Sequence, residues 1–295
     1  MSAERGNVLR GALLMAAAAV MFAIMHGSVR WVSAEIHPFE VAFFRNFFGF
    51  LVLIPWFATQ GLRPLRTKRF GLHMLRASSN VVAMVMFFMA LSMTPLAVVQ
   101  ALGFTAPLFA TVLAILILGE KVRLRRWTAL IAGFTGALII VRPGIQPLDA
   151  GSLLTVGSAA VWGLTLVMIK VLSRTDSAVT ITAYMVLLMT PLSLVPALFY
   201  WTWPGPEAWF WLAFCGVTGT LAQLLMTQSF RVADATVVMP FDFTKIVWGA
   251  LIGYLVFGEV VDVWTWVGAA VIFSGVTYIT YRERQLSGTA KDDQA

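Results

Sequence analysis

The chain has 295 residues, of which 59% are hydrophobic and only 12% are charged. A water-soluble domain carries about 25% charged residues, so this chain has too few to cover a soluble surface, and a polytopic membrane protein is indicated. The net charge of +7 comes from short basic clusters between long uncharged runs. That pattern sets membrane topology, and no nucleic-acid partner is expected.

Ten apolar runs are long enough to be membrane spans, because about 20 apolar residues cross the bilayer. They cover residues 9–33, 38–57, 70–93, 96–118, 126–141, 151–173, 179–200, 207–230, 235–257 and 263–281. The longest uncharged run extends from Ala77 to Gly119, and Thr94-Pro95 divides it into two helices joined by a tight turn. The sequence therefore predicts an all-α integral membrane fold with ten transmembrane helices.

The basic residues indicate how the chain is oriented. With ten spans both termini lie on one side, and most of the 21 basic residues fall in loops on that side. The two densest loop clusters are Arg63, Arg66, Lys68 and Arg69, and Lys121, Arg123, Arg125 and Arg126. The positive-inside rule then places both termini in the cytoplasm of a bacterium, with the chain in its inner membrane.

The two halves of the chain match in sequence when shifted by about 140 residues. The matches include Phe22 with Trp162, Arg30 with Lys170, Phe104-Thr105 with Phe243-Thr244, Gly119-Glu120 with Gly258-Glu259, and Gly136 with Gly275. Five spans per half is an odd number, so the second half enters the membrane from the opposite side and the repeat is inverted. We expect a first repeat over residues 1–144, a second over 145–284 and a disordered tail over 285–295.

Inverted repeats are typical of alternating-access transporters, in which two equivalent halves expose one central site to either side. The competing interpretation is a bundle that duplication merely made stable. An integral membrane enzyme is less consistent with the sequence, because there is no metal-ligand spacing, no Ser/His/Asp order and no glycine-rich phosphate loop. We therefore expect a transporter, not an enzyme, with no cofactor and no metal.

The segment from Ala90 to Gly144 resembles the EamA module of the drug/metabolite transporter superfamily, and Asp234 to Tyr281 repeats it. The residues that carry the resemblance are Pro95, Pro107, Leu118-Gly119-Glu120, Trp127, Gly136, Gly258-Glu259 and Trp266, with Phe44-Arg45-Asn46 in the second span. The resemblance implies a ten-helix carrier, and its YddG-type members export amino acids. Others of similar sequence take up riboflavin or S-adenosylmethionine.

Export of amino acids is the leading hypothesis from the sequence, and uptake of riboflavin, S-adenosylmethionine or a similar metabolite is the alternative. The expected partners are the lipid bilayer and a small organic substrate, for a monomer or a homodimer. The exact substrate, the direction of transport and the coupling to protons stay open at this point.

Three charged residues lie deep inside predicted spans, namely Arg45, Asp242 and Lys245. An ionised side chain there costs roughly 2.5–3.5 kcal/mol, so each needs a partner or a solvated surface. Asp242 and Lys245 are three residues apart on one helix, so they either neutralise each other or meet the opposite charges of a zwitterionic substrate. Arg45 either locks helices together or binds the substrate.

The other candidate substrate-binding residues are polar or aromatic side chains near the middle of a span, each of which could instead serve packing alone. They are Phe22, His26, Asn80, Gln100, Trp162, Gln223 and Trp248. Gln100, Gly103 and Pro107 share one face of the fourth span, and Thr220, Gln223 and Thr227 share one face of the eighth, so we expect both stripes to face inward. His73 and Arg76 begin the third span and are expected to extend toward the cytoplasmic surface.

Overall fold

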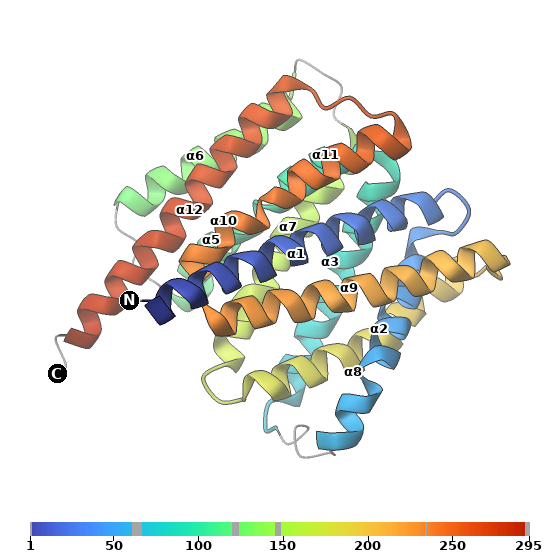
Figure 1. Cartoon of the computed structure of the whole chain (residues 1–295), viewed down its shortest axis with the longest axis horizontal. Helices are drawn as coiled ribbons and strands as arrows, with labels where there is room; N and C mark the ends of the chain where they lie inside the picture. The colour runs from blue at the N-terminus through green and yellow to red at the C-terminus, as the bar shows by residue number, and fades with distance from the viewer. Residues whose placement is uncertain (1, 61–66, 120–123, 145–148, 234, 293–295) are drawn as a thin grey trace.

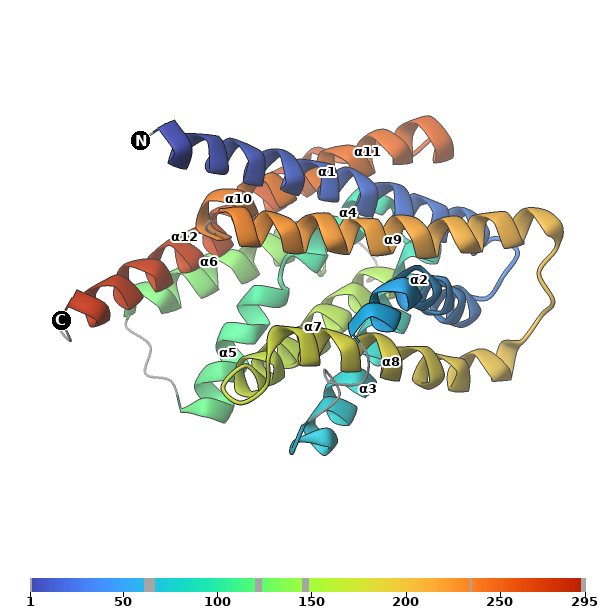
Figure 2. The same ribbon diagram turned by 60° about the horizontal axis from the view of Figure 1, so that its bottom comes forward.

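The computed structural model describes residues 2–60, 67–119, 124–144, 149–233 and 235–292, and this part of the chain is all helical (Figure 1). The helices are α1 (Ser2–Val32), α2 (Pro38–Gln60), α3 (Phe70–Met93), α4 (Leu96–Gly103), α5 (Ala106–Leu118), α6 (Leu124–Val141), α7 (Ala150–Leu172), α8 (Ala178–Ala197), α9 (Pro206–Val232), α10 (Ala235–Asp242), α11 (Thr244–Phe257) and α12 (Val263–Asp292). A short 3₁₀ turn, η2 (Leu198–Tyr200), follows α8. The two chain ends lie on the same side of the bundle (Figures 1 and 2). The C-terminal end of α1 and the N-terminal end of α12 lie away from that side.

The expected membrane fold is confirmed. Eight segments are long and apolar enough to cross a bilayer, and two shorter apolar helices, Leu130–Val141 and Val263–Tyr278, bring the crossings to the expected ten. The basic residues at positions 63, 66, 121 and 123, on which much of the topology argument rests, lie outside the described residues. The α12 helix continues to Asp292, into the segment for which the sequence led us to expect disorder.

The packing of the helices repeats between the two halves of the chain. Helix α1, the first of its half, packs against α9 and α11 of the other half. Helix α7, the first of the second half, packs in the same way against α3 and α5. The last helices, α6 and α12, lie side by side (Figures 1 and 2). The fold is therefore two five-span units that interlock through equivalent contacts.

The fourth span of each unit is broken in the middle. Helix α4 ends before α5 at Phe104-Thr105, and α10 ends before α11 at the aligned Phe243. In both breaks the threonine hydroxyl donates to the carbonyl oxygen three residues earlier: Thr105 to Leu102 at 2.7 Å and Thr244 to Phe241 at 2.6 Å. In the first unit the Leu102 carbonyl also accepts the backbone N–H of Thr105, at 3.0 Å, so the side chain adds a second bond at the break.

The break divides the stripe of Gln100, Gly103 and Pro107, so the expectation of one continuous helical face there was wrong. Pro107 lies in the first turn of α5, where a missing N–H costs nothing. The second unit breaks equally although it has Ile246 at the corresponding position. The second unit instead has Pro240 within α10, so no proline occupies the same position in both units, whereas the Phe-Thr pair is common to both.

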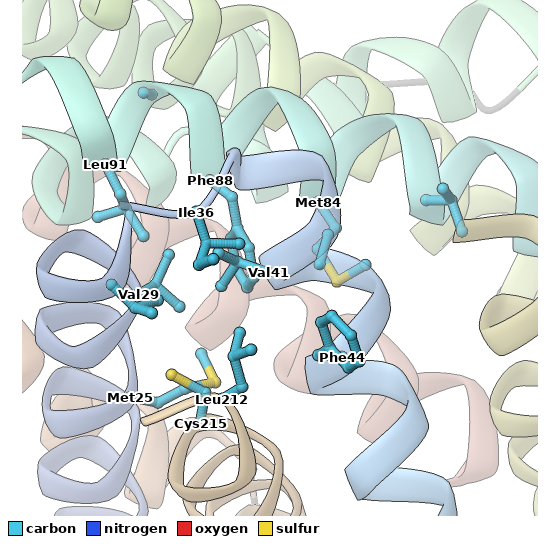
Figure 3. Close-up of a cluster of buried hydrophobic side chains, with 14 of the residues drawn as sticks. Met25, Val29, Ile36, Val41, Phe44, Met84, Phe88, Leu91, Leu212 and Cys215 are labelled. Carbon is cyan, nitrogen blue, oxygen red and sulfur yellow. The ribbon is translucent and has the colours of Figure 1, made fainter. Parts of the chain in front are cut away.

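Two apolar clusters hold the bundle together. The first joins α1, α2, α3 and α9, and Figure 3 shows Met25, Phe44, Phe88 and Leu212 converging in it. The second joins the broken spans to α6 and α12 around residues such as Leu108 and Ile272. The polar residues described next lie in α1, α2, α4, α10 and α11, so they draw on helices of both clusters.

Backbones approach closely between α6 and α12. A methyl group added at Gly136 would lie 2.7 Å from the carbonyl oxygen of Gly268 and 2.9 Å from the amide nitrogen of Ile272. Only glycine leaves room for such an approach, as in other tightly packed membrane helices. The pair α6·α12 is thus fixed by two residues without side chains.

Candidate functional site

Four of the candidate residues, together with Phe104, form one group, which we call the central cluster: Phe22 and His26 of α1, Phe104 between α4 and α5, Asp242 of α10 and Lys245 of α11. The Lys245 ammonium lies 5.2 Å from the centre of the Phe22 ring and 4.7 Å from that of Phe104. Both distances are within the range of a cation–π interaction. The Lys245 ammonium thus contacts rings from α1 and from the break between α4 and α5.

Lys245 and Asp242 form the ion pair that their spacing allows, with Lys245 Nζ 2.9 Å from Asp242 Oδ2. Their side chains keep 17% and 13% of their surface accessible. The second carboxylate oxygen of Asp242 is buried without a hydrogen-bond partner. The pair is therefore neutral as a unit, yet it retains one free acceptor.

The Phe104 ring packs directly against the ring of Phe243, the aligned residue of the second repeat. Phe104 and Phe243 stack with ring centres 3.9 Å apart and planes inclined by 13°. Since the two residues are aligned in the repeat, the stack lies where the two units meet. Sequence reasoning missed Phe104 and Phe243 as site residues, although their place in the repeat was visible.

His26 faces the cluster from α1. Its ring lies 5.1 Å from that of Phe87 on α3 and 6.2 Å from that of Phe22, and its Nδ1 atom is buried without a partner. The positive charges of Lys245 and Arg45 both act on it. His26 thus has an aromatic ring from α1 and another from α3 beside it.

Arg45 lies on α2, facing α9. Its guanidinium lies against Gly219 of α9, where an added methyl group would come within 3.1 Å of Nε. It donates to Asn46 Oδ1 at 3.1 Å, and Asn46 is held in turn by the hydroxyl of Ser193, 3.1 Å away. Among the residues that the structure describes, no carboxylate pairs with Arg45. Arg45 is therefore a partly buried cation whose charge no described carboxylate balances.

Gln100 lies on α4, one turn before Phe104. It is 3% exposed, and both atoms of its side-chain amide lack a hydrogen-bond partner. The amide rests on the bare α-carbon of Gly249, where an added methyl group would lie 2.5 Å from Oε1. Gln100 is thus buried next to the central cluster with its full hydrogen-bonding capacity unused.

The remaining candidates lie elsewhere. Asn80 is buried and contacts Met189 of α8, its Nδ2 3.1 Å from the sulfur. Gln223 is half-buried on α9, and Thr227 of the same stripe is exposed, so the expectation that the whole stripe faces inward was wrong. Trp162 and Trp248 are 44% and 38% exposed, and neither contacts a ring of the central cluster.

A second polar group, which we call the distal clamp, closes the end of the bundle away from the chain termini. Arg30 pairs with Glu259 and donates to the carbonyl oxygens of Leu91, at 3.0 Å, and Thr94. Glu259 in turn accepts from the backbone N–H of Leu96 at 3.0 Å. These contacts tie α1, α3 and α4 of the first unit to the segment after α11 of the second.

Asp149 extends the distal clamp to α7. It accepts the hydroxyl of Thr94 and caps α7 through the backbone N–H of Ser152, 2.8 Å away. Burial alone would raise the pKa of Asp149, but the hydrogen bonds from Thr94 and Ser152 outweigh it and hold the pKa below its usual value. The carboxylate therefore stays ionised and keeps the cap.

His73 and Arg76 do not extend to the surface as expected, because the loop between α7 and α8 folds over them. His73 is buried with its Nε2 atom 2.7 Å from Asp176 Oδ2, and it stacks on Tyr184 with ring centres 4.5 Å apart. Arg76 donates to the carbonyl oxygen of Ile181 at 3.0 Å. These residues attach the start of α3 to α8.

The ion pair of Asp176 should make stability depend on pH. Hydrogen bonds with Thr67 and His73 hold the pKa of Asp176 below its usual value of 3.8. A lowered pKa in the folded state adds stability that is complete above the unfolded value and disappears as the pH falls through the folded one. We expect Asp176→Asn to lower the melting temperature of the purified protein by a few degrees at pH 6.

That difference from the wild type should shrink as the pH falls below about 3.8, the unfolded pKa of the carboxyl. Glu35→Gln, at an exposed position, provides the control and should show no such difference. A gap between Asp176→Asn and the wild type that persists unchanged to pH 3 would show that the pair contributes through packing alone.

Two inverted units, interlocked around broken helices and a partly accessible charged cluster, define a membrane carrier. The family model of the EamA-like transporter family matches residues 9–142 and again residues 149–281. The chain therefore belongs to the EamA-like transporter family and is a multi-pass membrane transporter of the drug/metabolite superfamily.

The chain is similar to transporters of riboflavin and of S-adenosylmethionine. The chain is 39% identical to a riboflavin transporter of Vibrio cholerae, over 95% of each protein. It is 32% identical to a riboflavin transporter of Brucella anthropi, over 94% of this chain and 99% of that protein. An S-adenosylmethionine uptake transporter of Rickettsia bellii is 29% identical over 87% of this chain and 88% of its own length.

A crystal structure of another protein matches the fold with a TM-score of 0.62, over 96% of this chain and 99% of that one. At 16% sequence identity this match shows the common architecture alone.

Proposed function

We propose that the protein takes up riboflavin, or a closely related flavin, across the bacterial cytoplasmic membrane. The observation that carries the proposal is the aromatic surrounding of Lys245, with rings of Phe22 and Phe104 beside buried polar atoms that lack partners. A flat ring with polar edges suits such a surface, because it stacks on aromatic rings while its edges form hydrogen bonds. The names of the two riboflavin transporters support the same substrate.

The two other substrates fit the cluster less well. A zwitterionic amino acid would need Asp242 and Lys245 to be available, whereas the two side chains are bonded to each other. S-adenosylmethionine carries a positively charged sulfonium group, which the excess positive charge of Arg45 would repel. An uncharged flavin meets neither obstacle.

Transport is proposed to proceed by alternating access, with both chain termini in the cytoplasm. The two units would rock about the Phe104–Phe243 stack, where their broken spans meet. The distal clamp then lies toward the outside of the cell, and the attachment of α3 by His73 and Asp176 lies toward the inside. The similarity to the S-adenosylmethionine uptake transporter of Rickettsia bellii supports the inward direction.

Counterflow in proteoliposomes tests the function directly. Vesicles with purified protein and loaded with unlabelled riboflavin should accumulate labelled riboflavin, whereas protein-free vesicles should not. A tenfold excess of mixed amino acids or of S-adenosylmethionine should leave this accumulation unchanged. Exchange of labelled amino acids by vesicles that exchange no riboflavin would support the export hypothesis instead and refute this one.

A further inference from the structure

Gln100 is the polar side chain whose state the fold explains least. A buried amide that forms no hydrogen bond destabilises a protein, because its polar atoms have lost their bonds to water without replacement. Both the oxygen and the nitrogen of Gln100 are in that state, at 3% exposure. Buried polar groups in folded proteins almost always have hydrogen-bond partners. The part of the protein that the structure describes supplies none for Gln100, so a bound molecule is the candidate partner.

The position of Gln100 places it beside the central cluster. Helices α4 and α11 run antiparallel, since Phe104 lies near Lys245, Gln100 near Gly249 and Leu96 near Glu259. Gln100 and Phe104 are four residues apart on α4, as are Lys245 and Gly249 on α11, so each pair shares one face of its helix. The amide is thus one helical turn away from the rings that flank Lys245.

The second unit leaves this space open for the amide. Gly249 has no side chain, and a methyl group there would come within 2.7 Å of every amide atom of Gln100. A larger residue at this position would displace the amide from the seam between α4 and α11. Gly249 therefore makes room for the Gln100 amide and also allows α4 and α11 to approach closely.

A primary amide presents a donor and an acceptor side by side, in one plane. The complementary partner is a planar ring whose edge bears an N–H next to a C=O, such as the imide edge of the pyrimidine ring in a flavin. Glutamine pairs with nucleobase edges in a similar bidentate way, and such pairs discriminate between bases. A ring stacked near Phe22 and Phe104 would direct such an edge along the seam toward Gln100.

We propose that Gln100 determines substrate specificity by forming this bidentate pair with the imide edge of the transported flavin. The inference rests on the proposed function, since it requires that a flavin enters the central cluster. It goes beyond that function by naming the residue and the substrate edge that recognise each other.

The experiment compares riboflavin with N3-methylriboflavin, in which the imide N–H is replaced by a methyl group. Wild-type protein in proteoliposomes should show a half-saturation concentration about 10-fold higher for the methylated flavin, corresponding to the loss of about 1.4 kcal/mol. Gln100→Leu, which keeps the shape and removes the hydrogen bonds, should raise the value for riboflavin about 10-fold. It should also abolish the difference between the two flavins.

Gln223→Leu is the matched control, because Gln223 is half-buried on α9 outside the central cluster, and it should discriminate like the wild type. Equal half-saturation of the wild type for both flavins overturns the inference without any variant, so a poorly folding Gln100→Leu does not obscure the result. Full discrimination by a monodisperse Gln100→Leu protein overturns it too. The absence of any riboflavin flux in the wild type, by contrast, refutes the proposed function itself.

Discussion

Replacing Lys245 with methionine is expected to destabilise the protein by about 3 kcal/mol and to abolish riboflavin counterflow. The loss corresponds to the lower end of the range for a buried ion pair deprived of one partner, because Asp242 then keeps its charge without compensation. The ammonium also contacts two aromatic rings, and these contacts disappear with it. The melting temperature in detergent and the counterflow rate measure the two effects.

The double variant Lys245→Met, Asp242→Leu separates stability from transport. Removing both charges leaves no uncompensated group, so the melting temperature should return close to that of the wild type. Flux should stay absent, since the cation at the cluster is still missing. A double variant that transports normally would show that the pair only holds α10 and α11 together.

The pair of Arg142 and Asp262 is the control for these measurements. Asp262 is 43% exposed, and exposed ion pairs contribute about 0–1 kcal/mol. Arg142→Met should therefore change the melting temperature little. A loss as large as that of Lys245→Met would show that position in the bundle, and not burial, decides the cost.

The second large effect is expected at the contact between α6 and α12. Gly136→Ala should destabilise the protein by about 3 kcal/mol, because the new methyl group meets backbone atoms of α12 that no side-chain rotation can move away. The same substitution within a helix normally gains about 1 kcal/mol from helix propensity. Packing against α12 thus turns a substitution that normally stabilises a helix into a destabilising one.

Gly71→Ala is the matched control, since Gly71 lies in the first turn of α3 with no neighbouring atom within 4 Å of the added methyl group. The melting temperature of Gly71→Ala should equal or exceed that of the wild type. Equal melting temperatures for Gly136→Ala and the wild type would mean that α6 and α12 can move apart to admit the methyl group. The close contact would then contribute nothing to the free energy of unfolding.

Much of the fold follows from the sequence, because long apolar runs and a repeat in constant register are visible without coordinates. The ten crossings and the inverted halves were predicted from these two features. The broken spans were missed, since the threonine found at each break also occurs within intact helices. Only the repetition of Phe104-Thr105 as Phe243-Thr244 pointed to it.

The candidate site was predicted in part, because the sequence gives the depth of a residue in its span but not the direction in which the side chain points. Phe22 and Trp162 are aligned at the same depth, yet Phe22 lies beside Lys245 and Trp162 is 44% exposed. The sequence also did not show that Gly219 lies against Arg45 or that Gly249 lies against Gln100. A glycine in a sequence does not indicate which side chain occupies the space beside it.

The distal clamp has a consequence for an empty carrier. Arg30 and Leu96 belong to one unit and Glu259 to the other, so the two units can part at this end only after the Glu259 carboxylate leaves the Arg30 guanidinium and the Leu96 N–H. A ligand shifts such an equilibrium only through contacts that are stronger in the open form than in the closed one. In the proposed alternating-access cycle, the protein without substrate would therefore stay closed at this end.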